Sequence, residues 1–170
     1  GGAGLSLLAI DNSAARLARV RVNLARLALD CEIIHADAGD PASWWDGRLF
    51  QKILLDAPCS ALGVMRRHPD IRLRRSAADI AQANKEQRRL LHALWPLLAD
   101  GGRLLYATCS IVNSENDEII DTLLELHNDV SIIPIPVQAG RPTRHGRQIL
   151  PGDNDMDGFY YCLLAKRLPH

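Results

Sequence analysis

The stretch Lys52-Ile53-Leu54-Leu55-Asp56 is a short apolar run that ends in an acidic residue, and the same pattern occurs twice before it. Leu5–Ile10 is followed by Asp11, and Glu32–His35 is followed by Ala36 and then Asp37. The residues between the first two runs repeat leucine and valine at helical spacing. Strand and helix signals that alternate in this way indicate an α/β fold built in layers.

The rest of the chain continues this alternation. We expect a long helix that begins at Asp79 and ends near Pro96–Gly101, and a second helix over Glu115–His127. Further strands are predicted at Gly102–Thr108, Val130–Ile135 and Phe159–Ala165, besides a first helix over Ala14–Ala28. The polar stretch from Ala57 to Ser76 and the segment 136–157 are predicted to be loops, and long loops in compact domains are often functional.

Composition limits the possible functions. The 170 residues carry 20 basic and 20 acidic side chains and a formal net charge of zero, so any contact with nucleic acid must come from a local basic patch. We find neither an apolar run of about 18 residues nor the features of a signal peptide, and we expect a cytoplasmic protein. The four cysteines form no Cys-x-x-Cys pair, which predicts reduced thiols and no metal site.

The acidic residues at the strand ends are candidate ligand contacts. In an open parallel sheet the carboxyl ends of the strands face the ligand crevice. A carboxylate at this place can accept hydrogen bonds from ribose hydroxyls or from an adenine amine. The alternative is that Asp11, Asp37 and Asp56 each cap the next turn or helix, which is common.

Two cysteine segments carry the clearest chemistry. Leu54-Leu55-Asp56-Ala57-Pro58-Cys59-Ser60 and Tyr106-Ala107-Thr108-Cys109-Ser110 each place a cysteine directly after a predicted strand. Both strand ends should open into the same crevice, where backbone N–H dipoles lower a thiol pKa. The alternative for either cysteine alone is a small buried apolar residue.

These segments resemble those of the ribosomal RNA cytosine-5 methyltransferases of the RsmB/Sun (Fmu) group, within the NOL1/NOP2/Sun family. Asp56-Ala57-Pro58-Cys59-Ser60 is similar to the family's fourth motif, and Thr108-Cys109-Ser110 to its sixth. Arg66–Ile71, Leu150-Pro151-Gly152 and Asp157–Tyr160 match flanking signatures. The resemblance implies a Rossmann-like class I S-adenosylmethionine-dependent methyltransferase fold: three α/β/α layers and a mostly parallel sheet with an antiparallel last strand.

The resemblance also implies the chemistry. Carbon 5 of cytosine is a weak nucleophile, and a thiolate that adds to carbon 6 makes it enamine-like and reactive toward a methyl donor. The family pattern assigns the nucleophile to Cys109 and assistance in product release to Cys59. It assigns the cytosine edge, or a place near the methyl donor, to Asp56. The cofactor is S-adenosylmethionine, with Asp11 at its ribose hydroxyls and Asp37 at its adenine amine. The substrate is ribosomal RNA, and the similarity favours 16S.

The chain departs from the family pattern at its start. The Gly-rich cofactor loop of the form Asp-x-Cys-Ala-Ala-Pro-Gly-Gly-Lys-Thr is not found, and we interpret residues 1–4 as a truncated loop or a cloning remnant. We therefore expect residues 1–170 to be a catalytic domain that is incomplete at its N-terminus. Its sheet should have a gap between Leu5–Ile10 and Lys52–Leu55, where the first strand of the fold belongs.

A cluster of basic residues follows the first cysteine: Arg66, Arg67, His68, Arg72, Arg74 and Arg75. Guanidinium groups pair well with phosphates, so we expect RNA contact here. The alternative is a solvated loop whose charges pair with Asp70 and Asp79. A second, weaker basic cluster comprises Arg141, Arg144, His145 and Arg147.

Three other functions are compatible with parts of the pattern. A DNA cytosine-5 methyltransferase would use the Pro-Cys cysteine, Cys59, as its nucleophile. An amino-group methyltransferase would carry Asn/Asp-Pro-Pro-Tyr/Phe where this chain has Asp56-Ala57-Pro58-Cys59. A methyltransferase-like RNA-binding fragment without activity is the third, although the presence of both cysteines argues against it.

Overall fold

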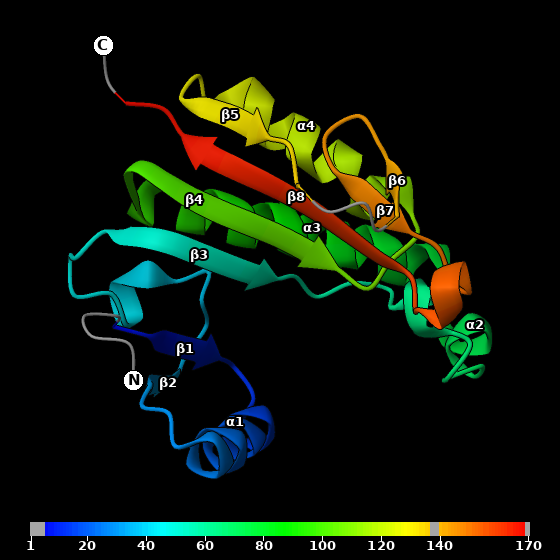
Figure 1. Ribbon diagram of the computed structural model, residues 1–170, viewed down its shortest axis with the longest axis horizontal. Coiled ribbons are helices and arrows are strands. Elements are labelled where there is room, and N and C mark those ends of the chain that lie inside the picture. Colours follow the sequence, from blue (N-terminus) through cyan, green and yellow to red (C-terminus); the bar gives the residue numbers. More distant parts are fainter. Residues whose placement is uncertain (1–5, 137–139, 169–170) are drawn as a thin grey trace. The chain divides into compact units, whose positions relative to one another are not determined.

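The computed structural model describes residues 6–136 and 140–168, and the chain divides into two units, Gly1–Arg48 and Leu49–His170 (Figure 1). Each unit has its own sheet. Among the described residues, no backbone ladder joins the two-stranded sheet of the first unit to the six-stranded sheet of the second. The gap predicted between the strands that end at Asp11 and Asp56 remains a prediction. The described helices include none that is long and apolar enough to cross a lipid bilayer.

The first unit is a βαβ element. Strands β1 (Leu8–Asp11) and β2 (Glu32–His35) pair in parallel, with α1 (Ala14–Leu27) between them and a 3₁₀ turn η1 (Pro41–Ser43) after them. The Ser13 side chain accepts a hydrogen bond from the Arg16 backbone N–H and so caps α1. The predicted helix and strands are confirmed; Leu5 and residues 1–4 lie outside the described residues.

The second unit is built on a mixed sheet. Its order is β3-β4-β8-β7-β6, and β5 also pairs with β8. These strands are β3 (Phe50–Asp56), β4 (Leu98–Thr108), β5 (Val130–Ile133), β6 (Arg141–Pro142), β7 (Arg147–Ile149) and β8 (Phe159–Lys166). β3 and β4 are parallel, whereas β8 runs antiparallel to β4. The predicted α/β fold with an antiparallel last strand is confirmed.

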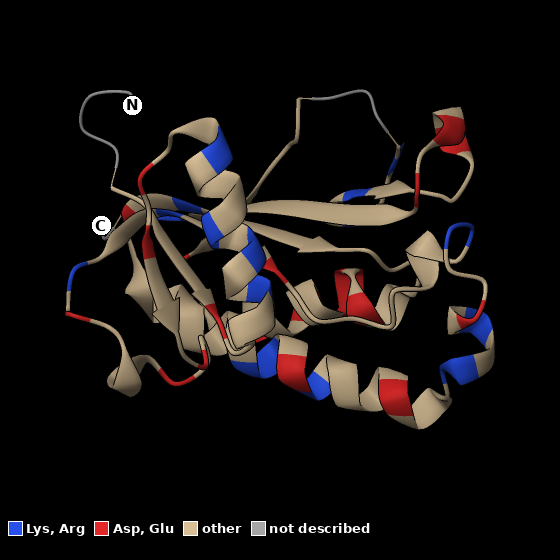
Figure 2. Cartoon of the chain, turned by 90° about the horizontal axis from the view of Figure 1, so that it is seen from below, with Lys and Arg blue, Asp and Glu red and all other residues tan. Residues whose placement is uncertain are grey.

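Two helices cover one face of this sheet, α3 (Ala77–Leu94) and α4 (Asp117–Leu126) (Figure 1). Leu91 of α3 and Ile120 of α4 are fully buried, as are Leu104 and Tyr106 of β4. Shorter helical turns lie in the connections: η2 (Leu62–Val64), α2 (Ile71–Arg74), η3 (Trp95–Leu97), η4 (Asn113–Glu115) and η5 (Asp153–Asp155). Figure 2 shows basic and acidic segments interspersed along the chain, in keeping with its zero net charge.

Several predicted boundaries were wrong. α3 begins at Ala77, because Ser76 is its cap and Asp79 completes a capping box as the third helical residue. α3 ends at Leu94 before Pro96, and β4 already begins at Leu98.

The predicted loops also contain regular structure. Segment 136–157 holds the β6–β7 hairpin and η5, and the predicted loop after Ala57 holds η2 and α2. A short hairpin in which hydrophobic and polar residues do not alternate gives no period-two signal, so sequence periodicity missed it.

Candidate active site

Two cysteines meet at the carboxyl ends of β3 and β4. The parallel register pairs Asp56 with Ala107, so both strands end at the same edge of the sheet. Cys59 and Cys109, which lie 50 residues apart in the chain, have their Sγ atoms 3.4 Å from each other. The predicted juxtaposition of the two cysteine segments is therefore present. Both thiols are free and partly exposed.

The two thiols differ in acidity. A hydrogen bond from the Cys59 thiol lowers the pKa of Cys109 to about 7, against the opposing effects of burial and of the Asp56 charge. The same hydrogen bond, together with burial, raises the pKa of Cys59 far above that of an ordinary thiol. Because the thiolate is the reactive form of cysteine, Cys109 is the better nucleophile of the pair near neutral pH.

The Cys59 loop is held by side chains from outside it. The fully buried Gln87 of α3 donates a hydrogen bond from Nε2 to the Pro58 carbonyl, at 2.8 Å. Arg75 Nε donates to the Ser60 carbonyl, at 2.9 Å. Arg75, which we predicted as an RNA contact, thus braces the cysteine loop with one of its guanidinium nitrogens.

The loop after Cys109 contains buried polar residues that our sequence reasoning did not single out. Thr108 donates a hydrogen bond from Oγ1 to Asn116 Oδ1, and Asn116 Nδ2 donates to the Ser110 carbonyl and to Gln148 Oε1. Glu115 is fully buried beside them. The available signal was that a serine follows each cysteine, with an acidic residue shortly after the second.

Two glycines let backbones approach closely behind the cysteines. The Gly63 backbone N–H donates to the Cys109 carbonyl, and the Gly158 N–H donates to the Gly63 carbonyl, at 2.9 and 2.8 Å. A Cβ atom on Gly63 would lie 2.1 Å from the Gly158 carbonyl oxygen. Only glycine fits at position 63. The close backbone contact that it permits joins the family-like Asp157–Tyr160 segment to the cysteine loops.

Some of the predicted RNA-binding residues line a pocket of about 600 Å³ in the second unit. Its walls include Arg66, Arg67 and the rings of Phe159 and Tyr161. The two ring planes are nearly parallel, and their centroids are 5.9 Å apart. Asp56 interacts electrostatically with Tyr161, whose pKa is raised by burial first and by this charge second. The pocket therefore adjoins the end of β3 that leads to the cysteines.

The basic residues between Arg66 and Arg75 differ in whether they form ion pairs within the fold. Arg66 and Arg67 pair with Asp155 and Asp157, and Arg74 pairs with Asp70 at 3.4 Å. His68 and Arg72 are exposed. Ion pairs within the fold therefore involve Arg66, Arg67 and Arg74. The pairing with Asp70 that the alternative predicted is present for Arg74, whereas Asp79 caps α3.

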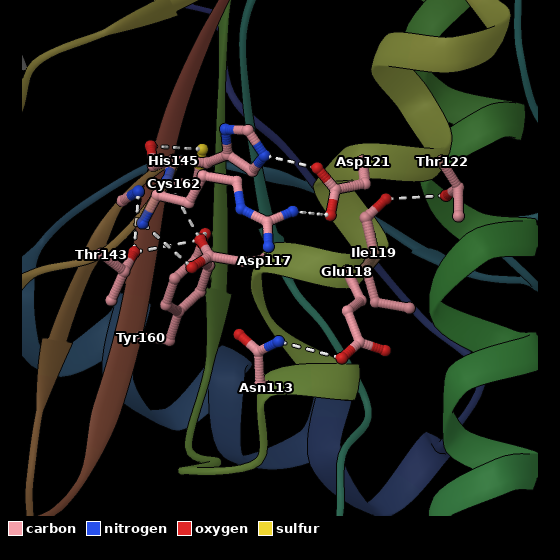
Figure 3. A network of polar contacts seen from close by, with 12 residues as sticks. Asn113, Asp117, Glu118, Ile119, Asp121, Thr122, Thr143, His145, Tyr160 and Cys162 are labelled. Atoms are coloured by element: carbon pink, nitrogen blue, oxygen red, sulfur yellow. Dashed lines mark hydrogen bonds and ion pairs between the residues drawn. The ribbon is translucent and has the colours of Figure 1, made fainter.

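The second basic cluster is largely neutralised within the fold (Figure 3). Asp121 of α4 accepts hydrogen bonds from Arg144 and from His145 Nε2, each at 2.6 Å. Asp117 accepts from the Tyr160 hydroxyl at 2.7 Å and from Thr143 Oγ1 at 3.0 Å. These contacts fasten the β6–β7 hairpin to α4 and β8, so Arg144 and His145 have a structural role.

The candidate cofactor residues of the first unit gather at the ends of β1 and β2. Asp11 accepts hydrogen bonds from the Ser13 backbone N–H and from Arg16 Nε, both at 2.7 Å, and Arg16 lowers the pKa of this carboxyl. Asp37 accepts from the Gly39 backbone N–H at 2.8 Å. Both therefore cap local turns, as the alternative predicted. The Asp11 carboxylate remains partly exposed beside Arg16.

The profile of the family described as 16S rRNA methyltransferase RsmB/F matches residues 3–165. The chain belongs to the RsmB/F family. The resemblance inferred from the cysteine motifs is thus confirmed.

Curated members of this family are similar over almost the whole chain. Ribosomal RNA small subunit methyltransferase B of Pseudomonas putida is 53% identical over 165 residues, which cover 96% of this chain and 38% of that protein. The Vibrio cholerae protein of the same name is 49% identical over 161 residues, covering 95% and 36%. The chain thus spans little more than a third of the length of these RsmB relatives.

Solved structures agree with this family assignment. NSun6 from Pyrococcus horikoshii, determined with SFG, superposes with a TM-score of 0.85 at 27% identity and covers 96% of this chain and 42% of that one. A methyltransferase homolog from the same organism gives 0.80 at 28% identity, with 95% and 53% covered. The predicted Rossmann-like methyltransferase fold is confirmed.

Proposed function

We propose that this chain carries the catalytic thiols of an S-adenosylmethionine-dependent enzyme that methylates carbon 5 of a cytosine in 16S ribosomal RNA. The observation that carries the proposal is the Cys59–Cys109 contact of 3.4 Å, in which Cys109 is the more acidic thiol. A single nucleophile would not require a second thiol at this distance. Membership of the RsmB/F family supports the methyl transfer and the ribosomal RNA substrate.

Cys109 performs the first step. Its thiolate adds to carbon 6 of the cytosine and makes carbon 5 nucleophilic. Asp56 lies exposed at the end of β3 and accepts a hydrogen bond from the amine on the cytosine edge. Cys59 keeps its proton during the addition. After the methyl group is on carbon 5, the carbon-5 proton passes to a solvent base, the bond between carbon 6 and the Cys109 sulfur breaks, and the double bond between carbons 5 and 6 re-forms. The Cys59 S–H donates a hydrogen bond to the departing Cys109 sulfur and stabilises it as a thiolate.

S-adenosylmethionine supplies the methyl group when it is bound. Asp11 would accept hydrogen bonds from its ribose hydroxyls and Asp37 from its adenine amine. We expect residues 1–170 alone to bind this cofactor weakly, because the chain shows no Gly-rich loop of the family type. Calorimetry that finds tight, stoichiometric binding to these residues would contradict this expectation.

The RNA contacts lie around the pocket that is lined by Arg66, Arg67, Phe159 and Tyr161. Arg66 and Arg67 are about half exposed or more, so their guanidinium groups are accessible to phosphates. Phe159 and Tyr161 offer aromatic faces on which an unstacked base can rest. His68, Arg72 and Arg74 extend the basic surface, while Arg75 contributes by holding the Cys59 loop.

Covalent capture of RNA tests the assignment of the thiols. In the complete protein that carries this chain, Cys109→Ala should abolish the protein–RNA adduct seen in denaturing gels. Cys59→Ala should instead accumulate it, because release is slowed while addition proceeds. The opposite result would favour the chemistry of a DNA cytosine-5 methyltransferase, with Cys59 as the nucleophile. An RNA-binding fragment without activity would give no adduct in either variant.

A further inference from the structure

A buried carboxylate joins the loops that carry the two cysteines. The Glu115 side chain is fully buried, and its Oε1 accepts a hydrogen bond from the Ser60 backbone N–H at 2.7 Å. Its Oε2 accepts from the Ser60 hydroxyl and from the Ser110 hydroxyl, each at 2.5 Å. One carboxylate therefore binds the residue that follows Cys59 and the residue that follows Cys109.

Burial of the Glu115 carboxylate costs free energy, and a role in capping α4 alone would not require that burial. Placing a carboxylate out of contact with water is unfavourable unless several donors compensate it. A cap for the start of α4 could be supplied at the surface, as Ser13 and Ser76 do for α1 and α3. The donors of Glu115 come instead from two loops that are 50 residues apart in the chain.

We propose that Glu115 is a positioning residue that ties the two cysteine loops together and so sets the distance between the sulfurs of Cys59 and Cys109. This inference rests on the proposed function, because it explains how that function's two thiols are held. Glu115 touches neither sulfur in a hydrogen bond among the described contacts, and it acts through the two serines.

The hydrogen bond between the sulfurs depends on this distance. When the contacts of Glu115 with the serines are lost, the two loops keep only the weaker Ser60–Ser110 hydroxyl contact at 3.3 Å and the Gly63–Cys109 backbone hydrogen bond. We expect the two sulfurs then to move apart, so that the Cys59 thiol no longer donates to Cys109. The acidity of Cys109, which this bond increases, should then approach that of an ordinary cysteine. The negative charge of Glu115 acts in the opposite direction, since it raises the pKa of both thiols.

The contacts of Glu115 with the serines and its negative charge act in opposite directions on the pKa of Cys109. Two substitutions of Glu115 therefore separate the two effects. Glu115→Gln removes the charge but keeps the tie, because its carbonyl accepts from the Ser60 N–H and its amide donates to the two serine oxygens. Glu115→Ala removes both the charge and the tie. If Glu115 acts only through its charge, both variants make Cys109 more acidic. If it positions the loops, only Glu115→Ala makes Cys109 less acidic.

The experiment measures the rate at which iodoacetamide modifies each cysteine as a function of pH, without RNA or cofactor. Trypsin places the two cysteines in different peptides, since Arg66 and Arg103 lie between them, so mass spectrometry follows each separately. We expect the midpoint of the pH dependence of Cys109 alkylation to lie near 7 in the unsubstituted (parent) chain and at or below that value in Glu115→Gln. In Glu115→Ala we expect it well above 7, with more than a tenfold loss of reactivity at pH 7. Glu118→Ala removes an exposed carboxylate of α4, three residues after Glu115, and is the control that should behave like the unsubstituted chain.

If Glu115→Ala does not fold, as judged by circular dichroism, the double variant Ser60→Ala and Ser110→Ala replaces it and should show the same rise. A Cys109 midpoint that stays at or below the parent value in the folded variant would overturn the proposal. The proposed function is tested separately by the RNA adduct, so a missing adduct with the expected thiol shift would refute that function while the positioning role stands.

Discussion

The contact between the two sulfurs makes a quantitative prediction for Cys59→Ala. The sulfurs of Cys59 and Cys109 lie 3.4 Å apart in the structure, and a hydrogen bond from the Cys59 thiol is the main cause of the lowered pKa of Cys109. Alanine has no donor at this place. The pKa of Cys109 should therefore rise from about 7 toward the ordinary value of 9.0.

The magnitude follows from the ionised fraction. With a pKa of about 7, roughly half of the Cys109 thiols are thiolates at pH 7, and with a pKa of 9.0 only about 1% are. Because the thiolate is the reacting species, the rate of Cys109 alkylation at pH 7 should fall by up to about 50-fold. The loss should disappear above pH 10, where both forms are ionised. Removal of Cys59 also exposes Cys109 to more water, which lowers its pKa and makes 50-fold an upper limit.

The assay is the alkylation rate of Cys109 between pH 5 and 10, with Cys31→Ala as the control that leaves the contact intact. RNA capture by Cys59→Ala should show the same pH dependence: the adduct accumulates, but forms slowly near pH 7 and faster at pH 9. An unchanged midpoint near 7 in Cys59→Ala would refute the hydrogen-bond explanation. So would a parent chain in which Cys59 is the faster-reacting cysteine at neutral pH.

Three further results are expected. Gly63→Ala should lower the free energy of unfolding in urea by about 1–3 kcal/mol, because its Cβ would overlap the Gly158 carbonyl. Tyr160→Phe should lower the free energy of unfolding by about 1–3 kcal/mol in the same measurement, since the buried Asp117 loses a hydroxyl donor at 2.7 Å. An unchanged free energy would show that this hydrogen bond to Asp117 does not stabilise the fold. Arg66→Ala in the complete protein should weaken RNA binding at all sequences and reduce the slope of log affinity against log salt by about 1, and an unchanged slope would show that no phosphate is bound there.

Much of the fold could be predicted from local signals. Hydrophobic periodicity located α1, α4 and the strands of the two sheets other than β6 and β7, and the acidic residues at the strand ends marked the edge where ligands are expected. Capping chemistry places the start of α3 at Ala77, because Asp79 lies inside the helix and its carboxylate accepts a hydrogen bond from the backbone N–H of the cap residue Ser76. The β6–β7 hairpin was missed, since its strands are held by contacts of Thr143 and His145 with α4 that no periodicity encodes.

The sequence by itself determined the family and the two reactive residue types, because Asp56-Ala57-Pro58-Cys59 and Thr108-Cys109-Ser110 are contiguous motifs. Only the tertiary structure decided that Cys59 and Cys109 share a hydrogen bond, and that Glu115 joins the serines behind them. It also decided that Arg144 and His145 fasten a hairpin, and that Arg75 braces a loop. The physical reason is range: helix and strand preferences act over a few residues, whereas these contacts join segments brought together by parallel strand pairing and side-chain packing.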